Sequence, residues 1–222
     1  MLSPIVGCVV GLLLAAVVLL RDPGGPTNRA FAAFATGAAA WCFAVYRFRA
    51  APDPDAALRW QLLVFVTLFL GPALYFHLAH AVGGVAERAG AVAVYVLSAA
   101  ALLTGVTRFD LFVRGVVGTP QGWAPRSGPL AAVWFFVALG ITTATYWPLA
   151  LARHRLGPQQ RARPLTLLIV GNTLRLLAPL LTFAGALLAQ AGTIPRPLPP
   201  VVVEATVFVI VLAAGATLDA GS

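Results

Sequence analysis

The sequence lacks lysine altogether, and charged residues make up only 10% of its 222 residues. Without lysine the chain cannot form a Schiff base with retinal or pyridoxal phosphate, and it cannot build a phosphate-binding loop that ends in Gly-Lys. Soluble domains carry about a quarter charged residues, so the low charge excludes a soluble domain as well. The chain is therefore neither a rhodopsin-type pigment protein nor a nucleotide hydrolase of the phosphate-loop class.

Enzyme signatures are also missing from the sequence. None of its serines lies in a Gly-x-Ser-x-Gly turn, and there is no His-Glu-x-x-His zinc motif, Cys-x-x-Cys pair or dinucleotide-binding glycine pattern. The two cysteines, Cys8 and Cys42, lie inside apolar runs, where a thiol behaves as a small hydrophobic group. We therefore expect a protein that is not an enzyme.

Long apolar runs dominate what is present, since 60% of the residues are hydrophobic. A transmembrane helix needs about 20 apolar residues, and breaks rich in Gly, Pro and Arg divide the chain into seven such runs. We expect an all-α integral membrane protein with a single seven-helix domain over residues 1–222. The predicted spans are about 2–20, 30–46, 58–83, 89–107, 129–151, 164–190 and 197–217. The basic and aromatic segment 108–117 is expected to lie in the membrane interface.

Proline interrupts the third, fifth and sixth predicted spans, at Pro72, Pro148 and Pro179. Each proline lacks the N–H that would bond to the carbonyl one turn earlier, so each favours a kink. The fifth span also carries a cluster of hydroxyl groups, at Thr142, Thr143, Thr145 and Tyr146. We expect these hydroxyls to bond to the backbone or to neighbouring helices.

The distribution of arginine predicts the orientation. The loops on the two sides carry equal numbers of arginines, so the overall count does not decide it. However, nothing basic precedes the first span, Arg21 and Arg29 follow it, and the dense arginine cluster at 153–163 lies on that same side. Because arginine-rich loops stay in the cytoplasm, we expect the N-terminus outside and the C-terminus inside. The arginines fit contacts with anionic membrane lipids rather than with nucleic acid.

Arg175 lies near the middle of the sixth predicted span, where an unpaired charge costs about 3 kcal/mol or more. Glu204 is the only acid inside a predicted span, and helix rise places both residues roughly 16–19 Å from the cytoplasmic face. We expect them to pair, with Asn172 nearby because it precedes Arg175 by one turn. Such a pair either fixes helix packing or forms a pocket for an anion, a proton or a ligand, and both interpretations stay open.

Three histidines are the candidates for a metal or tetrapyrrole site. His77 and His80 are three residues apart on the third predicted span, and His154 lies at the cytoplasmic end of the fifth span, on the same side of the membrane. Such imidazoles could ligate a metal, a haem or a chlorophyll. Histidines near a span end more often form interfacial hydrogen bonds, which is the interpretation we prefer, so no cofactor is predicted.

Several short motifs follow one another in an order that resembles a known family. They are Asn28, Arg29, Phe31, Phe34 and Trp41, then Arg59, Trp60, Gly71, Pro72, Tyr75, Phe76 and His77, then Gly128, Pro129, Gln160, Arg161, Gly171 and the proline-rich link 195–200. This order resembles the seven-transmembrane sensory input region at the N-terminus of many bacterial histidine kinases. The resemblance covers nearly the whole chain and implies a sensory module in the bacterial cytoplasmic (inner) membrane.

The sequence departs from that family after the last predicted span, where no phosphoacceptor histidine region and no ATP-binding domain follow. We therefore expect the chain to act by binding a ligand or partner membrane proteins, with a separate signalling partner carrying the output. The alternative is a structural accessory subunit of a larger respiratory or photosynthetic membrane complex, packed against other membrane subunits.

Overall fold

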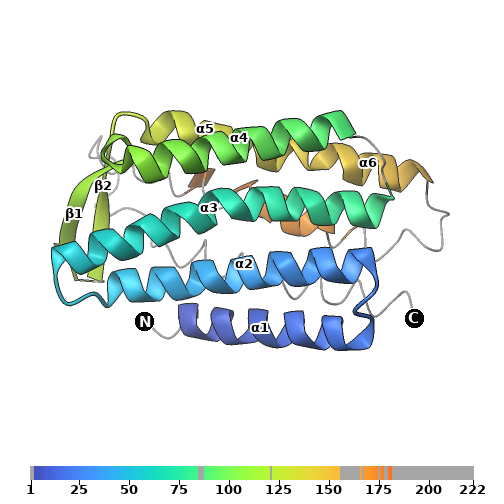
Figure 1. Cartoon of the computed structure of the whole chain (residues 1–222), viewed down its shortest axis with the longest axis horizontal. Coiled ribbons are helices and arrows are strands. Elements are labelled where there is room, and N and C mark those ends of the chain that lie inside the picture. Colours follow the sequence, from blue (N-terminus) through green and yellow to red (C-terminus); the bar gives the residue numbers. More distant parts are fainter. Residues whose placement is uncertain are drawn as a thin grey trace.

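The computed structural model describes residues 3–84, 88–120, 122–155 and 168–174, together with 166, 176–177 and 180–181. Most of this part of the chain is helical, and the helices run lengthwise along the molecule (Figure 1). The helices are α1 (Ser3–Arg21), α2 (Pro26–Arg49), α3 (Pro54–Gly83), α4 (Arg88–Thr107), α5 (Ala131–Ala144) and α6 (Tyr146–Arg155). After α4 come a short 3-10 helix, η1 (Phe109–Leu111), and two strands, β1 (Val113–Thr119) and β2 (Gly122–Ser127).

Within the described residues, five helical stretches are long and apolar enough to cross a membrane. They are Pro4–Arg21, Pro26–Arg49, Pro54–Gly83, Gly90–Thr107 and Ala131–His154. These stretches coincide with the first five predicted spans and indicate a multi-pass membrane protein. The described pieces of the sixth predicted span are helical, and the seventh, 197–217, lies outside the described residues.

The ends of α3 follow from local chemistry. Pro54 occupies the first turn, where its missing N–H costs nothing, and the side chain of Asp53 accepts a hydrogen bond from the Ala56 N–H at 2.7 Å. At the other end Gly84 caps the helix with φ +57°, in the left-handed region that glycine adopts without strain. The boundaries of this 30-residue helix are therefore encoded in adjacent residues.

Small residues bring α1 close to α2. A Cβ atom added at Gly7 would lie 3.0 Å from the Cys42 sulfur, and one added at Gly11 would lie 3.1 Å from the Ala35 carbonyl oxygen. Because lipid tails provide no hydrophobic drive between helices, such close backbone approach supplies much of the packing energy. On its other side α2 packs against α3, which also contacts α4, α5 and α6 and is thus the central helix of the bundle (Figure 1).

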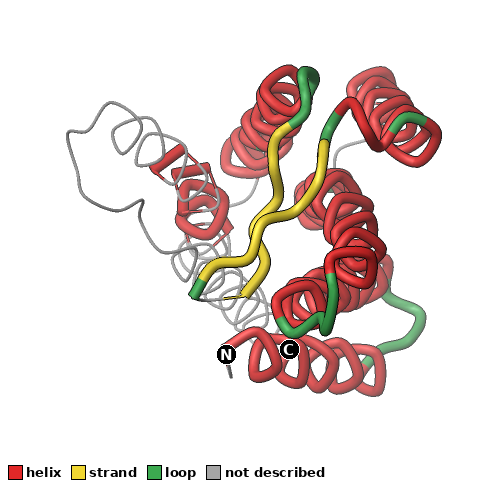
Figure 2. Tube along the Cα trace, turned by 90° about the vertical axis from the view of Figure 1, so that its left-hand side faces the viewer, coloured by secondary structure: helices red, strands yellow, loops and turns green. Residues whose placement is uncertain are grey.

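A β-hairpin covers one end of the bundle, and the expectation of an all-α fold is wrong there. Segment 108–117, expected at the interface, forms η1 and part of β1, which pairs antiparallel with β2. The turn uses Gly122 with φ +109°. Figure 2 shows the two strands lying across the ends of the helices. Edge strands leave backbone groups unpaired, which is tolerated at a bundle end but not inside the hydrocarbon region.

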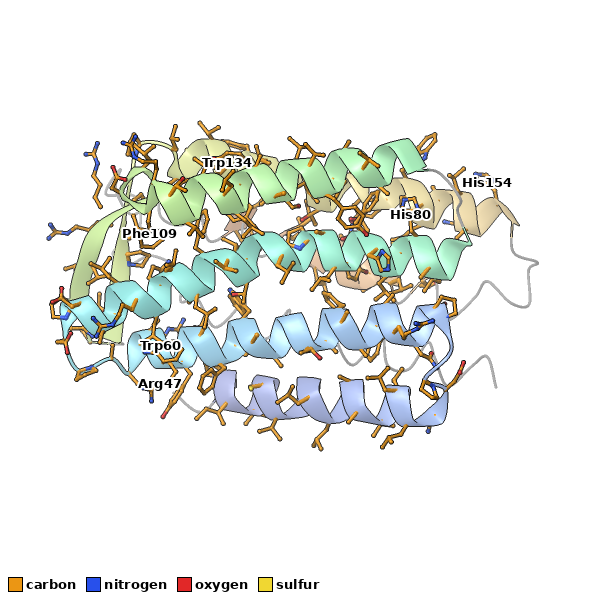
Figure 3. The ribbon with its side chains drawn as sticks, in the orientation of Figure 1. Arg47, Trp60, His80, Phe109, Trp134 and His154 are labelled. Atoms are coloured by element: carbon orange, nitrogen blue, oxygen red, sulfur yellow. The ribbon has the colours of Figure 1, made fainter. Side chains whose placement is uncertain are left out.

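Aromatic side chains attach this hairpin to the helices. The indole N–H of Trp123 donates to the Ala51 carbonyl at 2.8 Å, which ties β2 to the loop between α2 and α3. Beneath the hairpin the ring of Phe112 lies 4.5 Å from Phe65 and 6.1 Å from Trp134, centroid to centroid. The aromatic cluster therefore joins the hairpin segment to α3 and α5. At the same end Arg47 lies over the ring of Trp60 (Figure 3).

Candidate functional site at the break between α5 and α6

The fifth membrane-spanning stretch is broken in its middle. α5 ends at Ala144 and α6 begins at Tyr146, two residues before Pro148, which has no N–H to offer the Ala144 carbonyl one turn earlier. The helical hydrogen-bond pattern is interrupted before this proline, as a kink requires, while Thr145 between the two helices keeps helical dihedrals of φ −63° and ψ −21°. The hydroxyls near the break bond to their own helix, as expected, since Thr142 and Thr145 donate to carbonyls one turn earlier at 2.9 and 3.2 Å.

Asn172 lies against this break and is completely buried. Its amide Nδ2 donates to the Thr142 carbonyl at 3.1 Å, and the Thr145 N–H donates to the same oxygen at 3.3 Å. The other side-chain atom, Asn172 Oδ1, is buried and has no hydrogen-bond partner within the described part of the chain. A buried acceptor without a donor costs about 1–3 kcal/mol, so this oxygen is a place where a hydrogen-bond donor would be stabilised.

Two tyrosines hold residues 168–174 beside the break. Tyr146 donates its hydroxyl to Thr173 Oγ1 at 2.7 Å, because the Thr173 hydroxyl itself donates to the Ile169 carbonyl at 2.8 Å. From α3, the hydroxyl of the fully buried Tyr75 donates to the Leu168 carbonyl at 2.7 Å. Together with Asn172, these bonds connect residues 168–174 to α3, α5 and α6. We call Tyr75, Thr142, Tyr146, Asn172 and Thr173 the break cluster.

The break cluster lies deep in the apolar part of the protein. Thr145 follows Ala131 by 14 residues and precedes His154 by nine, which corresponds to roughly 21 Å and roughly 14 Å of helix. The hydrocarbon core of a bilayer is about 30 Å thick, so the break lies near its middle. The cluster consists of hydroxyl, amide and carbonyl groups, which can bind a polar ligand through hydrogen bonds.

The structure does not describe the two charged members of the predicted pocket. Arg175 and Glu204 lie outside the described residues, so their pairing stays a prediction. Asn172, which we expected near that pair, is buried and bonds to the Thr142 carbonyl. Sequence reasoning missed Tyr75 as a member of the cluster. In the sequence Tyr75 is a hydroxyl-bearing residue of an apolar run and a position of the resemblance motif, and neither feature reveals a partner 93 residues away.

The histidines do not converge on a single point. His77 Nδ1 and the Tyr95 hydroxyl lie 2.6 Å apart, which links α3 to α4 and agrees with a hydrogen-bonding histidine. His80 packs its ring 4.6 Å from that of Phe76, and His154 lies near the same end of the molecule on α6 (Figure 3). In the described ranges no group of three or more His, Cys, Asp or Glu side chains could hold a metal. With Nδ1 engaged by Tyr95, Nε2 of His77 would be the atom to ligate a metal or tetrapyrrole.

Comparison with known proteins adds no family assignment. No protein-family model matches the chain, and no curated protein matches it. The resemblance to histidine-kinase sensory input regions thus rests on the short motifs of the sequence and stays a prediction.

Proposed function

We propose that this protein is a non-enzymatic membrane module that acts by binding, with the break cluster as its ligand site. The observation that supports this function is the buried Asn172 amide, whose Oδ1 faces no donor in the described residues beside a helix broken near mid-membrane. Interrupted helices that meet near the bilayer midplane are a recurrent way to build polar binding sites in membrane proteins. Proteins retain costly buried polar groups in membranes mainly where they serve a function.

A sensory role is the form of this function that we favour. The break joins two helical pieces, α5 and α6, and residues 168–174 contact both through Asn172 and Tyr146. A ligand that donates a hydrogen bond to Asn172 Oδ1 would bind best to one relative position of these pieces and so shift the population toward it. Arg175, one turn beyond Asn172, and Glu204 are the charged groups that we propose complete the pocket. In the proposed seven-span topology the C-terminus lies in the cytoplasm, where a separate signalling partner would respond to the shift in the positions of α5 and α6.

An accessory subunit of a larger membrane complex is the alternative function. α1 and α4 expose continuous apolar surfaces, including Leu13 and Leu20 on one and Val96 and Leu103 on the other. These helices lie at opposite edges of the view in Figure 1. Lipid covers such faces in a free-standing receptor, whereas an accessory subunit requires other protein chains there.

Native mass spectrometry of the protein extracted in a mild detergent tests the proposal. The wild type is compared with Asn172→Val, which removes the amide, and with Thr143→Val, a matched control whose exposed hydroxyl bonds only within α5 in the described structure. We expect a small-molecule adduct on the wild type and the control that is absent from Asn172→Val. A wild type without any adduct would contradict the ligand site, and a fixed set of co-purifying chains would support the accessory subunit.

A further inference from the structure

An open groove runs along the outer face of α2, away from the break cluster. Its volume is about 550 Å³, within the range of about 300–1,000 Å³ typical of small-molecule sites. Small residues form its floor, and leucines of α1 and α3 form its walls. The lining residues are Leu19, Arg29, Ala32, Ala33, Thr36, Gly37, Ala40, Leu70 and Leu74. We call this the α2 groove.

The α2 groove exists because α2 is recessed between its neighbours. Ala33 and Ala40 are exposed but short, whereas Leu19 of α1 and Leu70 of α3 project on either side and are more than a third exposed. Gly37 allows close packing of α3, since a Cβ there would lie 2.7 Å from Leu74 Cδ1. The result is an apolar channel in a surface that faces the lipid.

One end of the α2 groove carries a positive charge. Arg29 lies in the first turns of α2, and its Nη2 donates to the Gly24 carbonyl at 3.2 Å, which holds the guanidinium at the bundle end. A guanidinium has five N–H donors in a fork that suits phosphate oxygens. Arg21 ends the neighbouring α1 at the same end of the bundle (Figure 1). The carboxylate of Asp22 lies in the same turn, where it accepts the Gly24 and Gly25 N–H groups, so the two arginines leave this end with a net positive charge.

The length of the α2 groove matches one leaflet. From Arg29 to Ala40 the helix advances by 11 residues, or roughly 17 Å, and half of a hydrocarbon core is about 15 Å. We propose that the α2 groove binds a phospholipid with an anionic headgroup, whose phosphate contacts Arg29 and whose acyl chain lies over Ala33 and Gly37 between the leucines. Two features favour a phospholipid as the occupant: the arginine at one end matches an anionic headgroup, and the apolar channel has the length of one leaflet. A protein helix would not require a cation at that end.

Native mass spectrometry with added lipid tests this site on the full chain. The probes are phosphatidylglycerol and phosphatidylcholine with identical acyl chains, titrated onto the delipidated protein in detergent. We expect the first phosphatidylglycerol to bind about fivefold more tightly than phosphatidylcholine, since one arginine near an anionic lipid contributes about 1 kcal/mol. Equal binding of the two lipids by the wild type would overturn the proposal.

Two pairs of variants locate the lipid. Arg29→Gln should remove the preference for phosphatidylglycerol over phosphatidylcholine. Arg153→Gln is the control: Arg153 is exposed and belongs to the last turn of α6, which ends at the same end of the bundle where α2 begins (Figure 1), and its loss should leave the preference unchanged. Ala33→Leu should fill the groove and weaken binding of both lipids, unlike Ala99→Leu on an exposed face of α4. If a variant and its control changed lipid binding equally, the site would be overturned. Displacement of phosphatidylglycerol by free glycerol phosphate would overturn it too, because the headgroup alone would then account for binding. A co-purifying protein that displaces the lipid would assign the groove to a protein partner instead.

Discussion

Replacing Asn172 by valine should stabilise the folded protein. In the described structure the amide makes one hydrogen bond, to the Thr142 carbonyl at 3.1 Å, and leaves Oδ1 without a donor. A hydrogen bond between transmembrane helices contributes about 0.6 kcal/mol on average, whereas an unsatisfied buried acceptor costs about 1–3 kcal/mol. Removing both the hydrogen bond and the unsatisfied acceptor should therefore raise the free energy of unfolding by about 1 kcal/mol. The Thr142 carbonyl keeps its bond from the Thr145 N–H, so no new unsatisfied group is created there.

Reversible unfolding in mixed micelles with increasing sodium dodecyl sulfate, followed by tryptophan fluorescence, measures this change. A gain of about 1 kcal/mol favours the folded state about fivefold and moves the midpoint to a higher detergent fraction. Thr142→Val is the matched control, because its hydroxyl bonds only to the Ala138 carbonyl of its own helix among the described residues, and we expect a change close to zero.

A free energy of unfolding that falls by more than about 1 kcal/mol in Asn172→Val would refute this reasoning. It would mean that the amide contributes to stability through more bonds than the one to Thr142, as expected of a purely structural residue. A binding residue is instead expected to lower stability in the empty protein, because function and stability compete at such sites.

Three further predictions concern packing, a hydrogen bond and topology. Gly105→Ala should lower the free energy of unfolding by about 1–3 kcal/mol in the same assay, because the added Cβ would overlap the Phe65 ring. Gly90→Ala on the same helix places its Cβ in open space and should leave stability unchanged or slightly raised. A larger loss in Gly90→Ala than in Gly105→Ala would contradict the contact between α3 and α4. A double-mutant cycle of His77→Ala and Tyr95→Phe should give a coupling free energy of about 0.6 kcal/mol, and a coupling of zero would exclude their hydrogen bond. In a variant without Cys8 and Cys42, Thr119→Cys should react with a membrane-impermeant maleimide on intact cells and Gly24→Cys only after lysis; the reverse would invert the proposed orientation.

The first four helices were predictable because their signals are local. Inside a membrane each helix satisfies its own backbone hydrogen bonds, so an apolar run bounded by proline and glycine is enough to define it. The starts and ends of α1 to α4 therefore fall close to the predicted boundaries, with the largest difference at α2, where the 30–46 prediction missed polar turns at both ends. Pro148 likewise predicted the break in the fifth span through a single missing N–H.

The hairpin was not predictable in the same way. β1 and β2 are seven and six residues long, contain glycine and proline, and show little alternation between apolar and polar residues. Each strand is stable only with the other, and the pair is fixed to the bundle by Trp123, whose carbonyl partner Ala51 is 72 residues away. Such pairing depends on distant parts of the chain meeting, which no local pattern records.

Some features of the candidate site were predictable from the sequence, and others depend on the tertiary structure. The sequence alone determined a membrane-embedded helical protein, the position of one helix break and the presence of polar residues beside it, because propensity and hydropathy act over a few neighbouring residues. Only the tertiary structure decided that Asn172 meets the Thr142 carbonyl, that Tyr75 bonds to Leu168, and that α2 is recessed to form a groove ending at Arg29. These contacts depend on which helix faces are turned toward each other. That choice is made by close packing among many side chains at once.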